Sequence, residues 1–257
     1  MTSPVNALVK ATNIWDFVIT PAGKMFVAKN DDGIALRFYH GMTYDTKASD
    51  IWGGLCKGAE IVIDVGAHTG FYSLLAYKSG AKRVISVEPY MINYARLAMN
   101  LRANGWPVSG CRYVAASDMR GMVKLSIPAT PHYCSTGCSV YEGDKRFGSS
   151  FVEMVLLDDL IDPSDYPKVN AIKIDVEGAA HKVLQGMPKL LDQGPDIIIE
   201  VDDPYKTTSQ AIQKTKDIFN LLEGLGYVLT KIEEDHPVFP SGELDIRIPN
   251  YYATRRS

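Results

Sequence analysis

The sequence predicts an α/β fold in which a mostly parallel sheet carries helices on both faces. Short apolar runs rich in β-branched residues alternate along the chain with segments in which apolar residues recur at helical spacing. The first such unit is a strand over 61–65, a glycine turn over 66–70 and a helix that begins near Phe71. The next strand ends at Glu88, 24 positions after Asp64, the spacing at which a βαβ nucleotide site places a carboxylate on a ribose.

Residues 1–58 precede this core and are expected to form a β-rich elaboration, with the main domain over 59–257. Three strands over 16–20, 25–28 and 34–38, joined by turns at 21–23 and 31–33, predict a small meander. The stretch 43–52 comes just before the core and could line a ligand site. Trp52, at its end, is interpreted as a packing residue.

Helix and strand alternate from Glu88 to the end of the chain. Helices are predicted after Pro89, near 180–187 and over 212–222, and strands over 111–115, 122–127, 151–156, 171–176, 196–201, 227–232 and 250–254. The segment 128–150 lies between two of these strands and is too long for an ordinary connection in a compact domain. Long structured loops of this kind often act as lids.

Two features of the first turn favour one cofactor class over another. A dinucleotide fingerprint requires a glycine where this chain has His68, because a side chain there would crowd the pyrophosphate. The carboxylate of Asp64 would repel a diphosphate, whereas it could bind an ammonium group and lie favourably near a cationic sulfonium. S-adenosylmethionine is therefore the predicted cofactor, and a nicotinamide-dependent oxidoreductase is the alternative.

The motifs occur in a fixed order along the chain. They are Asp64-Val65-Gly66-Ala67-His68-Thr69-Gly70, Val87-Glu88-Pro89, Ala116-Ser117-Asp118-x-x-Gly121, Leu157-Asp158-Asp159-Leu160 and Ile172-Lys173-Ile174-Asp175-Val176-Glu177-Gly178. This set resembles the FkbM family of S-adenosylmethionine-dependent methyltransferases over roughly residues 60–200. Two positions depart from the family pattern, His68 where Asn is common and Ala180 where a second Glu is common.

The resemblance implies a Rossmann-like class I methyltransferase fold, with a seven-stranded sheet whose last strand runs antiparallel. It also implies O-methylation of a polyketide, sugar or other small molecule, and N-methylation is an alternative on the same fold. Asp64 and Glu88 are expected to hold the aminoacyl end and the ribose of the cofactor. The other expected cofactor contacts are Gly66, Ala67, His68, Gly70, Ser117 and Asp175. Ser117 would lie beside the adenine, or else belong to a turn closed by an Asx hydrogen bond.

Three acids fall at the ends of neighbouring predicted strands. Asp175 and Glu177 follow one strand, and Glu200 ends the next, so we expect them to border the methyl acceptor as catalytic residues. An extended backbone would point Asp175 and Glu177 to the same side, although both could instead cap the following helix. A hydroxyl acceptor benefits from a carboxylate that takes its proton, so these acids favour a hydroxyl or amine acceptor. His132 and His236, in loops, are further candidates for a base.

Composition disfavours several classes of partner. The net charge of −3 and pI near 6.0 give no basic footprint, so nucleic acid is not expected and a small-molecule or glycan acceptor is. No secretory signal and no apolar run of about 18 residues is present, which predicts a cytoplasmic protein without a membrane span. No metal site is predicted, because the four cysteines form no paired C-x-x-C units. The sequence makes no prediction of the oligomeric state.

Overall fold

The computed structural model describes residues 15–28, 32–128, 146–201, 209–232 and 250–255. Its centre is a seven-stranded sheet in the order β11-β12-β10-β9-β3-β4-β5. The strands are β3 (Ile61–Val65), β4 (Arg83–Val87), β5 (Cys111–Arg112), β9 (Val169–Ile174), β10 (Asp196–Glu200), β11 (Tyr227–Ile232) and β12 (Asn250–Arg255). Neighbouring strands from β10 to β5 pair in parallel, and β12 pairs antiparallel with both β10 and β11. The predicted mostly parallel sheet with an antiparallel last strand is confirmed.

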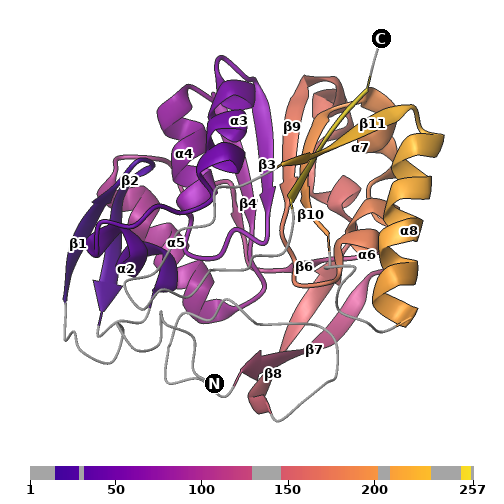
Figure 1. Cartoon of the computed structure of the whole chain (residues 1–257). Helices are drawn as coiled ribbons and strands as arrows, with labels where there is room; N and C mark the ends of the chain where they lie inside the picture. The colour runs from indigo at the N-terminus through magenta and orange to yellow at the C-terminus, as the bar shows by residue number, and fades with distance from the viewer. Residues whose placement is uncertain (1–14, 29–31, 129–145, 202–208, 233–249, 256–257) are drawn as a thin grey trace.

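Helices cover both faces of this sheet, as the two side layers of Figure 1 show. One layer holds α3 (Thr46–Cys56), α4 (Phe71–Ser79) and α5 (Met91–Ala103), and the other holds α6 (Ala180–Gln185), α7 (Pro188–Gln193) and α8 (Ser209–Gly224). Side chains alternate across each strand, so Val62 of β3 enters the core under the first layer, while Ile61, Ile63 and Val65 enter the core under the second. Parallel strands buried on both faces explain the continuous apolar runs in the sequence.

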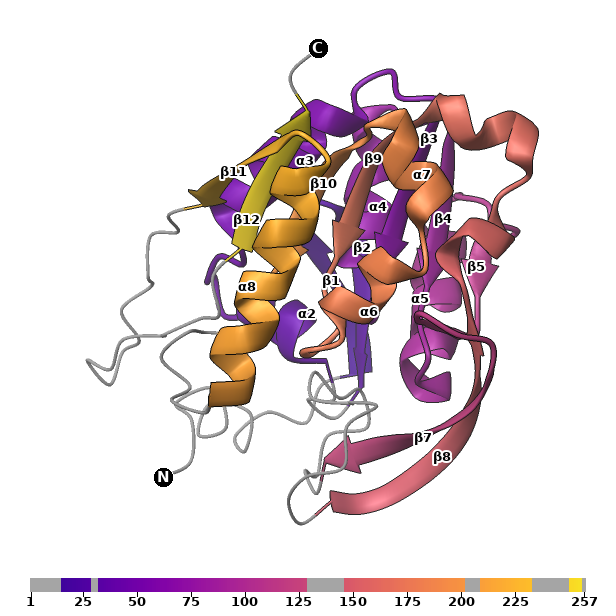
Figure 2. The same cartoon turned by 90° about the vertical axis from the view of Figure 1, so that its right-hand side faces the viewer.

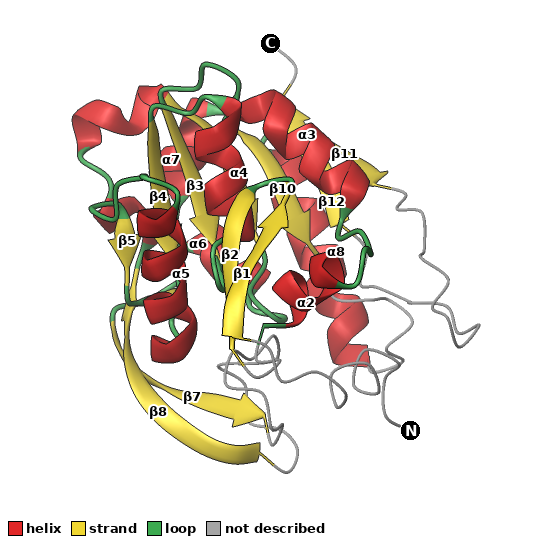
Figure 3. Ribbon diagram, turned by 90° about the vertical axis from the view of Figure 1, so that its left-hand side faces the viewer, coloured by secondary structure: helices red, strands yellow, loops and turns green. Residues whose placement is uncertain are grey.

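The N-terminal part differs from the predicted three-stranded meander. β1 (Trp15–Thr20) and β2 (Gly23–Ala28) form the expected hairpin, which packs outside α4 and α5 (Figure 3). The predicted third strand is instead the helix α2 (Gly33–Tyr39). Asp32, read as a turn residue, starts this helix, since its carboxylate accepts hydrogen bonds from the backbone N–H groups of Ile34 (2.9 Å) and Ala35 (3.0 Å).

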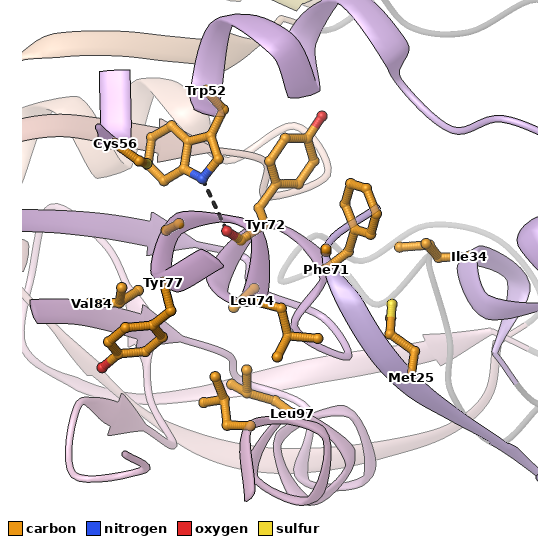
Figure 4. Packing of buried hydrophobic residues seen from close by; sticks show 14 of the residues in the cluster. Met25, Ile34, Trp52, Cys56, Phe71, Tyr72, Leu74, Tyr77, Val84 and Leu97 are labelled. Atoms are coloured by element: carbon orange, nitrogen blue, oxygen red, sulfur yellow. Dashed lines mark hydrogen bonds between the residues drawn. The ribbon is translucent and has the colours of Figure 1, made fainter. Parts of the chain in front are cut away.

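Trp52 packs inside the first helical layer. Its side chain is completely buried, and its indole N–H donates a hydrogen bond to the backbone carbonyl of Tyr72 at 3.0 Å (Figure 4). The ring of Tyr72 meets the indole edge-on. The prediction that Trp52 is a packing residue is confirmed.

The strand predicted over 111–115 is divided between two sheets. β5 ends at Arg112, and Ala115–Ala116 form β6 of a second, three-stranded sheet with β7 (Gly121–Pro128) and β8 (Arg146–Val155). β6 pairs in parallel with the end of β8, so the chain leaves the central sheet to reach this partner. β7 and β8 form a long hairpin that extends beyond the layers at one end (Figure 2). Most of the predicted lid segment, with His132, lies outside the described residues.

Two short 3₁₀ helices, Leu157–Leu160 and Pro163–Lys168, connect β8 to β9. Across the part of the chain that the structure describes, no helix combines the length and the apolar character needed to cross a membrane.

Candidate functional site

A cavity opens at the carboxyl ends of four central strands. Residues at or just after those ends line it: Glu200 on β10, Asp175 after β9, Gly66 after β3 and Glu88 after β4. Ligands of open parallel sheets bind at this edge, because the connecting loops gather there. The structure therefore brings these four sequence-predicted residues together around one space.

Gly66 allows the ends of β3 and β9 to approach closely. Its backbone has φ +82°, and a Cβ atom at this position would lie 1.7 Å from the carbonyl oxygen of Asp175. Its N–H donates a hydrogen bond to the carbonyl of Val87 at 2.9 Å, which ties the turn to β4. No side chain fits at position 66, so the cavity has a bare backbone floor at this point.

Glu88 is a buried carboxylate at the rim of the same turn. It accepts hydrogen bonds from the backbone N–H groups of His68 (2.8 Å) and Tyr90 (2.9 Å). The backbone of His68 has φ 50°, which directs its N–H group at Glu88, and His68 also lines the cavity. Burial, opposed by these hydrogen bonds, raises the pKa of Glu88 to about 7.

The acidic end of the cavity lies at β9 and β10. Asp175, Glu177 and Glu200 all line it. The backbone is not extended from Asp175 to Glu177, because Glu177 has φ 49° and Gly178 has φ 87°. The expected strand-like alternation is therefore wrong, although both residues line the cavity. Burial, together with the neighbouring charge of Asp175, raises the pKa of Glu200 well above its ordinary value.

The opposite end of the cavity is apolar. Pro89 follows β4, while Ala115, Ala116 and Leu125 come from the small sheet, and all four line the cavity. In the strand order β10-β9-β3-β4, this end and the acidic end lie on opposite sides of β3. A ligand that spans the cavity would thus meet apolar walls first, then Glu88 and Gly66, then three acids.

Tyr44 and Ile34 complete the lining from the N-terminal part of the chain. The ring of Tyr44 is fixed edge-on against Phe71, with ring centres 5.4 Å apart. Neither residue was predicted as a site residue. For Tyr44 the signal in the sequence was the position of residues 43–52 just before the core, whereas Ile34 fell in a predicted strand of the meander.

Asp64 is not among the residues that line the cavity. Its side chain points to the α3–α4 face of β3, where its Oδ2 accepts a hydrogen bond from the Ser73 hydroxyl at 2.6 Å. It is 1% exposed and pairs in register with Lys173 of β9. The carboxylate of Asp64 was expected at the cavity end of β3, but it is buried against Ser73 of α4.

Three other expected cofactor contacts also lie outside the cavity lining. Gly70 precedes α4 with φ +99°, and a Cβ there would lie 2.7 Å from Leu97, so helix packing accounts for this glycine. Ala67 is buried. Ser117 donates a hydrogen bond to Asp118 Oδ1 at 3.0 Å in a turn, while its neighbour Ala116 lines the cavity. His236, the second loop histidine, lies outside the described residues.

The buried carboxyls predict a pH-dependent stability. Burial raises the pKa of Asp64 to about 6 and that of Glu88 to about 7. A carboxyl whose pKa is higher in the folded than in the unfolded state stabilises the fold at low pH, and this contribution is lost as the pH rises through the folded pKa. We therefore expect the free energy of unfolding to fall between pH 5 and pH 8.

Urea unfolding at both pH values checks this. Asp64→Asn should reduce the fall by about 1 kcal/mol, because the contribution of the Asp64 carboxyl is removed. Asp192→Asn, an exposed position on α7, is the control and should keep the wild-type fall. A wild-type stability that rises over this range would contradict the electrostatics described here.

The charge of the cavity restricts what it can bind. Among the described residues that line it, four are acids and none is Lys or Arg. Such a surface attracts a cation and repels a diphosphate, because a diphosphate would need basic side chains or a free helix N-terminus. The arrangement therefore suits a nucleoside with a positive charge next to an acceptor with exchangeable protons.

Comparison with known proteins agrees with this geometry. A curated relative, the hexuronic acid methyltransferase AglP of Haloferax volcanii, is 26% identical over 178 residues, which are 68% of this chain and 67% of AglP. The crystal structure of an O-methyltransferase from Bacillus cereus in complex with SAH covers 100% of this chain and 92% of its own, with a TM-score of 0.50 and 11% identity. That likeness shows the Rossmann-like methyltransferase fold.

The family model of the methyltransferase FkbM domain matches residues 64–229. This range begins at Asp64, contains every residue named above from Gly66 to Glu200, and covers well over half of the 257 residues. The chain belongs to the FkbM family of methyltransferases.

Proposed function

We propose that the protein transfers the methyl group of S-adenosylmethionine to a hydroxyl group of a neutral sugar or sugar-like small molecule. The observation that carries this proposal is a cavity in which an apolar end, the buried Glu88 and three further acids follow one another along the sheet edge. S-adenosylmethionine supplies the electrophilic methyl carbon of a one-step displacement. Everything else in the reaction falls to the residues of this chain.

The cofactor half of the proposal rests on Glu88 and Gly66. Glu88 keeps acceptor capacity beside two backbone N–H donors, so it could bind the two hydroxyls of a ribose. Gly66 leaves a bare backbone over which the chain of the cofactor can pass. Pro89, Ala116 and Leu125 offer apolar contacts for an adenine ring. The residues present fit the cofactor without any basic group.

The acceptor half rests on the three acids. A hydroxyl oxygen attacks more readily when a carboxylate takes its proton as the bond to carbon forms. Asp175 forms an ion pair with Lys173, and burial raises the pKa of Glu200 well above its ordinary value. Glu177 lines the cavity beside both, and we propose it as the general base, with Glu200 as a further contact of the acceptor.

The relative AglP supports a sugar acceptor, and the charge of this cavity refines the class of sugar. The name of AglP describes a methyltransferase for a hexuronic acid. A carboxylate acceptor would meet Asp175, Glu177 and Glu200, and like charges at close range cost free energy. We therefore propose a neutral hydroxyl rather than a uronate as the acceptor.

Methyl transfer from tritiated S-adenosylmethionine tests the proposal. Neutral sugars, uronic acids and amino sugars are offered as separate acceptor pools, and the labelled products are treated with alkali. A methyl ether from the neutral pool, stable to alkali, is expected. Label released as methanol would identify a methyl ester, and label on nitrogen of an amino sugar would identify N-methylation, and either result would contradict the proposal.

A further inference from the structure

Lys173 is a buried cation at the centre of the sheet. It lies on β9, which is hydrogen-bonded between β3 and β10, and its side chain is 1% exposed. An ammonium removed from water destabilises a fold unless it is well paired. The partners of Lys173 therefore explain why a lysine stands there.

Two contacts fix the ammonium. Its Nζ atom lies 2.7 Å from Oδ2 of Asp175, the cavity-lining carboxylate two residues further along the chain. It also lies 4.3 Å from the ring centre of Tyr72, a cation-π contact from α4. Asp175 thus connects Lys173, which is hidden from the cavity, to the acidic end that lines it.

Titratable groups face Lys173 from each element packed against it. Asp64 comes from β3, Glu200 from β10 and Tyr72 from α4, and Cys56 of α3 is close enough to Asp64 to feel its charge. Burial alone would lower the pKa of Lys173, but the carboxylates of Asp175, Asp64 and Glu200 raise it overall, so the ammonium stays charged. Burial raises the pKa values of the Cys56 thiol and the Tyr72 hydroxyl, which stay neutral.

We propose that Lys173 is a positioning residue of the methyl-transfer site, whose buried ammonium fixes the carboxylate of Asp175 at the cavity wall and balances the charge of Asp64 behind it. This role rests on the proposed function. The ammonium of Lys173 interacts with three carboxyl groups, those of Asp64, Asp175 and Glu200. It therefore determines how the negative charge is divided between the buried side of the sheet, where Asp64 lies, and the cavity, which Asp175 and Glu200 line. A residue that only filled space would have no such effect.

Urea unfolding at pH 5.5 and pH 8 separates charge balance from packing. Lys173→Met keeps most of the side-chain length and removes the charge, so Asp64 and Asp175 lose their cation. The midpoint of unfolding should fall more at pH 8, where Asp64 with its pKa of about 6 is ionised, than at pH 5.5. Lys189→Met, at an exposed position on α7, should match the wild type at both values. An equal loss at both pH values would reduce Lys173 to a packing residue and overturn the proposal.

A double-mutant cycle on cofactor affinity tests the link to the site. Titration calorimetry with S-adenosylmethionine at pH 8 compares wild type, Lys173→Met, Asp175→Asn and the double variant. Because Lys173 acts through Asp175, the combined change in affinity should differ from the product of the single changes by at least about fivefold. A multiplicative result would separate the two residues and overturn the proposal.

A second set of variants keeps the test usable if Lys173→Met does not fold. In that case the same cycle is measured with Asp64→Asn present in all four proteins, which removes the second uncompensated carboxylate. The two proposals fail differently. Absence of S-adenosylmethionine binding by the wild type would overturn the proposed function, whereas the pH comparison of unfolding still decides the role of Lys173.

Discussion

Gly66→Ala is expected to destabilise the protein by more than about 3 kcal/mol, or to prevent folding, and to abolish cofactor binding. The added Cβ would lie 1.7 Å from the carbonyl oxygen of Asp175, so backbone must move at the place where β3 and β9 meet. Overpacking of this kind costs about 1–3 kcal/mol where side chains can adjust, and here the neighbour is main chain. The positive φ adds roughly 1 kcal/mol of strain. Chemical unfolding measures the loss.

Gly58→Ala is the matched control. Gly58 has φ +73°, close to the +82° of Gly66, but a Cβ there meets nothing within 4 Å. Its replacement should cost only the strain of the positive φ, about 1 kcal/mol. Equal losses for the two variants would show that the contact with Asp175 is not what requires glycine at position 66.

Glu177→Gln is expected to lower turnover by about 10²- to 10⁴-fold while the affinity for S-adenosylmethionine stays near the wild-type value. The amide keeps the size of the side chain and cannot take a proton from the acceptor. Turnover is measured with the acceptor pool that is labelled by the wild-type protein. Affinity is measured separately by calorimetry.

Glu153→Gln provides the control for this substitution. Glu153 is exposed on β8 and does not line the cavity, so both turnover and affinity should be unchanged. Unchanged turnover in Glu177→Gln would remove Glu177 as the base. A parallel loss of cofactor affinity would instead assign Glu177 to the cofactor half of the site.

The sheet was predictable because local patterns and tertiary structure agree. β3, β4, β9 and β10 are largely buried on both faces, and each appears in the sequence as a short run dominated by β-branched apolar residues. The helix α2 was not predictable from the same kind of pattern. Residues 34–38 form a short, mostly apolar run after a turn, which fits a strand as well as a helix. The deciding feature was the carboxylate of Asp32, which caps two backbone N–H groups.

The site was predictable where main-chain geometry determines it. Gly66 and Glu88 follow directly from the strand–turn–helix pattern, and the acids after β9 and β10 follow from the strand ends. The placement of the Asp64 side chain was not predictable, because a strand residue can face either side of the sheet. Packing against Ser73 and Lys173 decides which side Asp64 faces. Tyr44 reaches the cavity through tertiary packing on Phe71, which no local pattern encodes.

Calorimetric titration of the wild-type protein at pH 8 with S-adenosylmethionine, and separately with NADH, tests the central claim most directly. Glu88 is ionised at this pH, because its pKa is about 7. We expect saturable binding of S-adenosylmethionine at one site, no binding of NADH, and an affinity at least about tenfold weaker in Glu88→Ala, which loses hydrogen bonds to a charged acceptor. Binding of NADH at this site, or no binding of S-adenosylmethionine, would contradict an acidic cavity built for a cationic nucleoside.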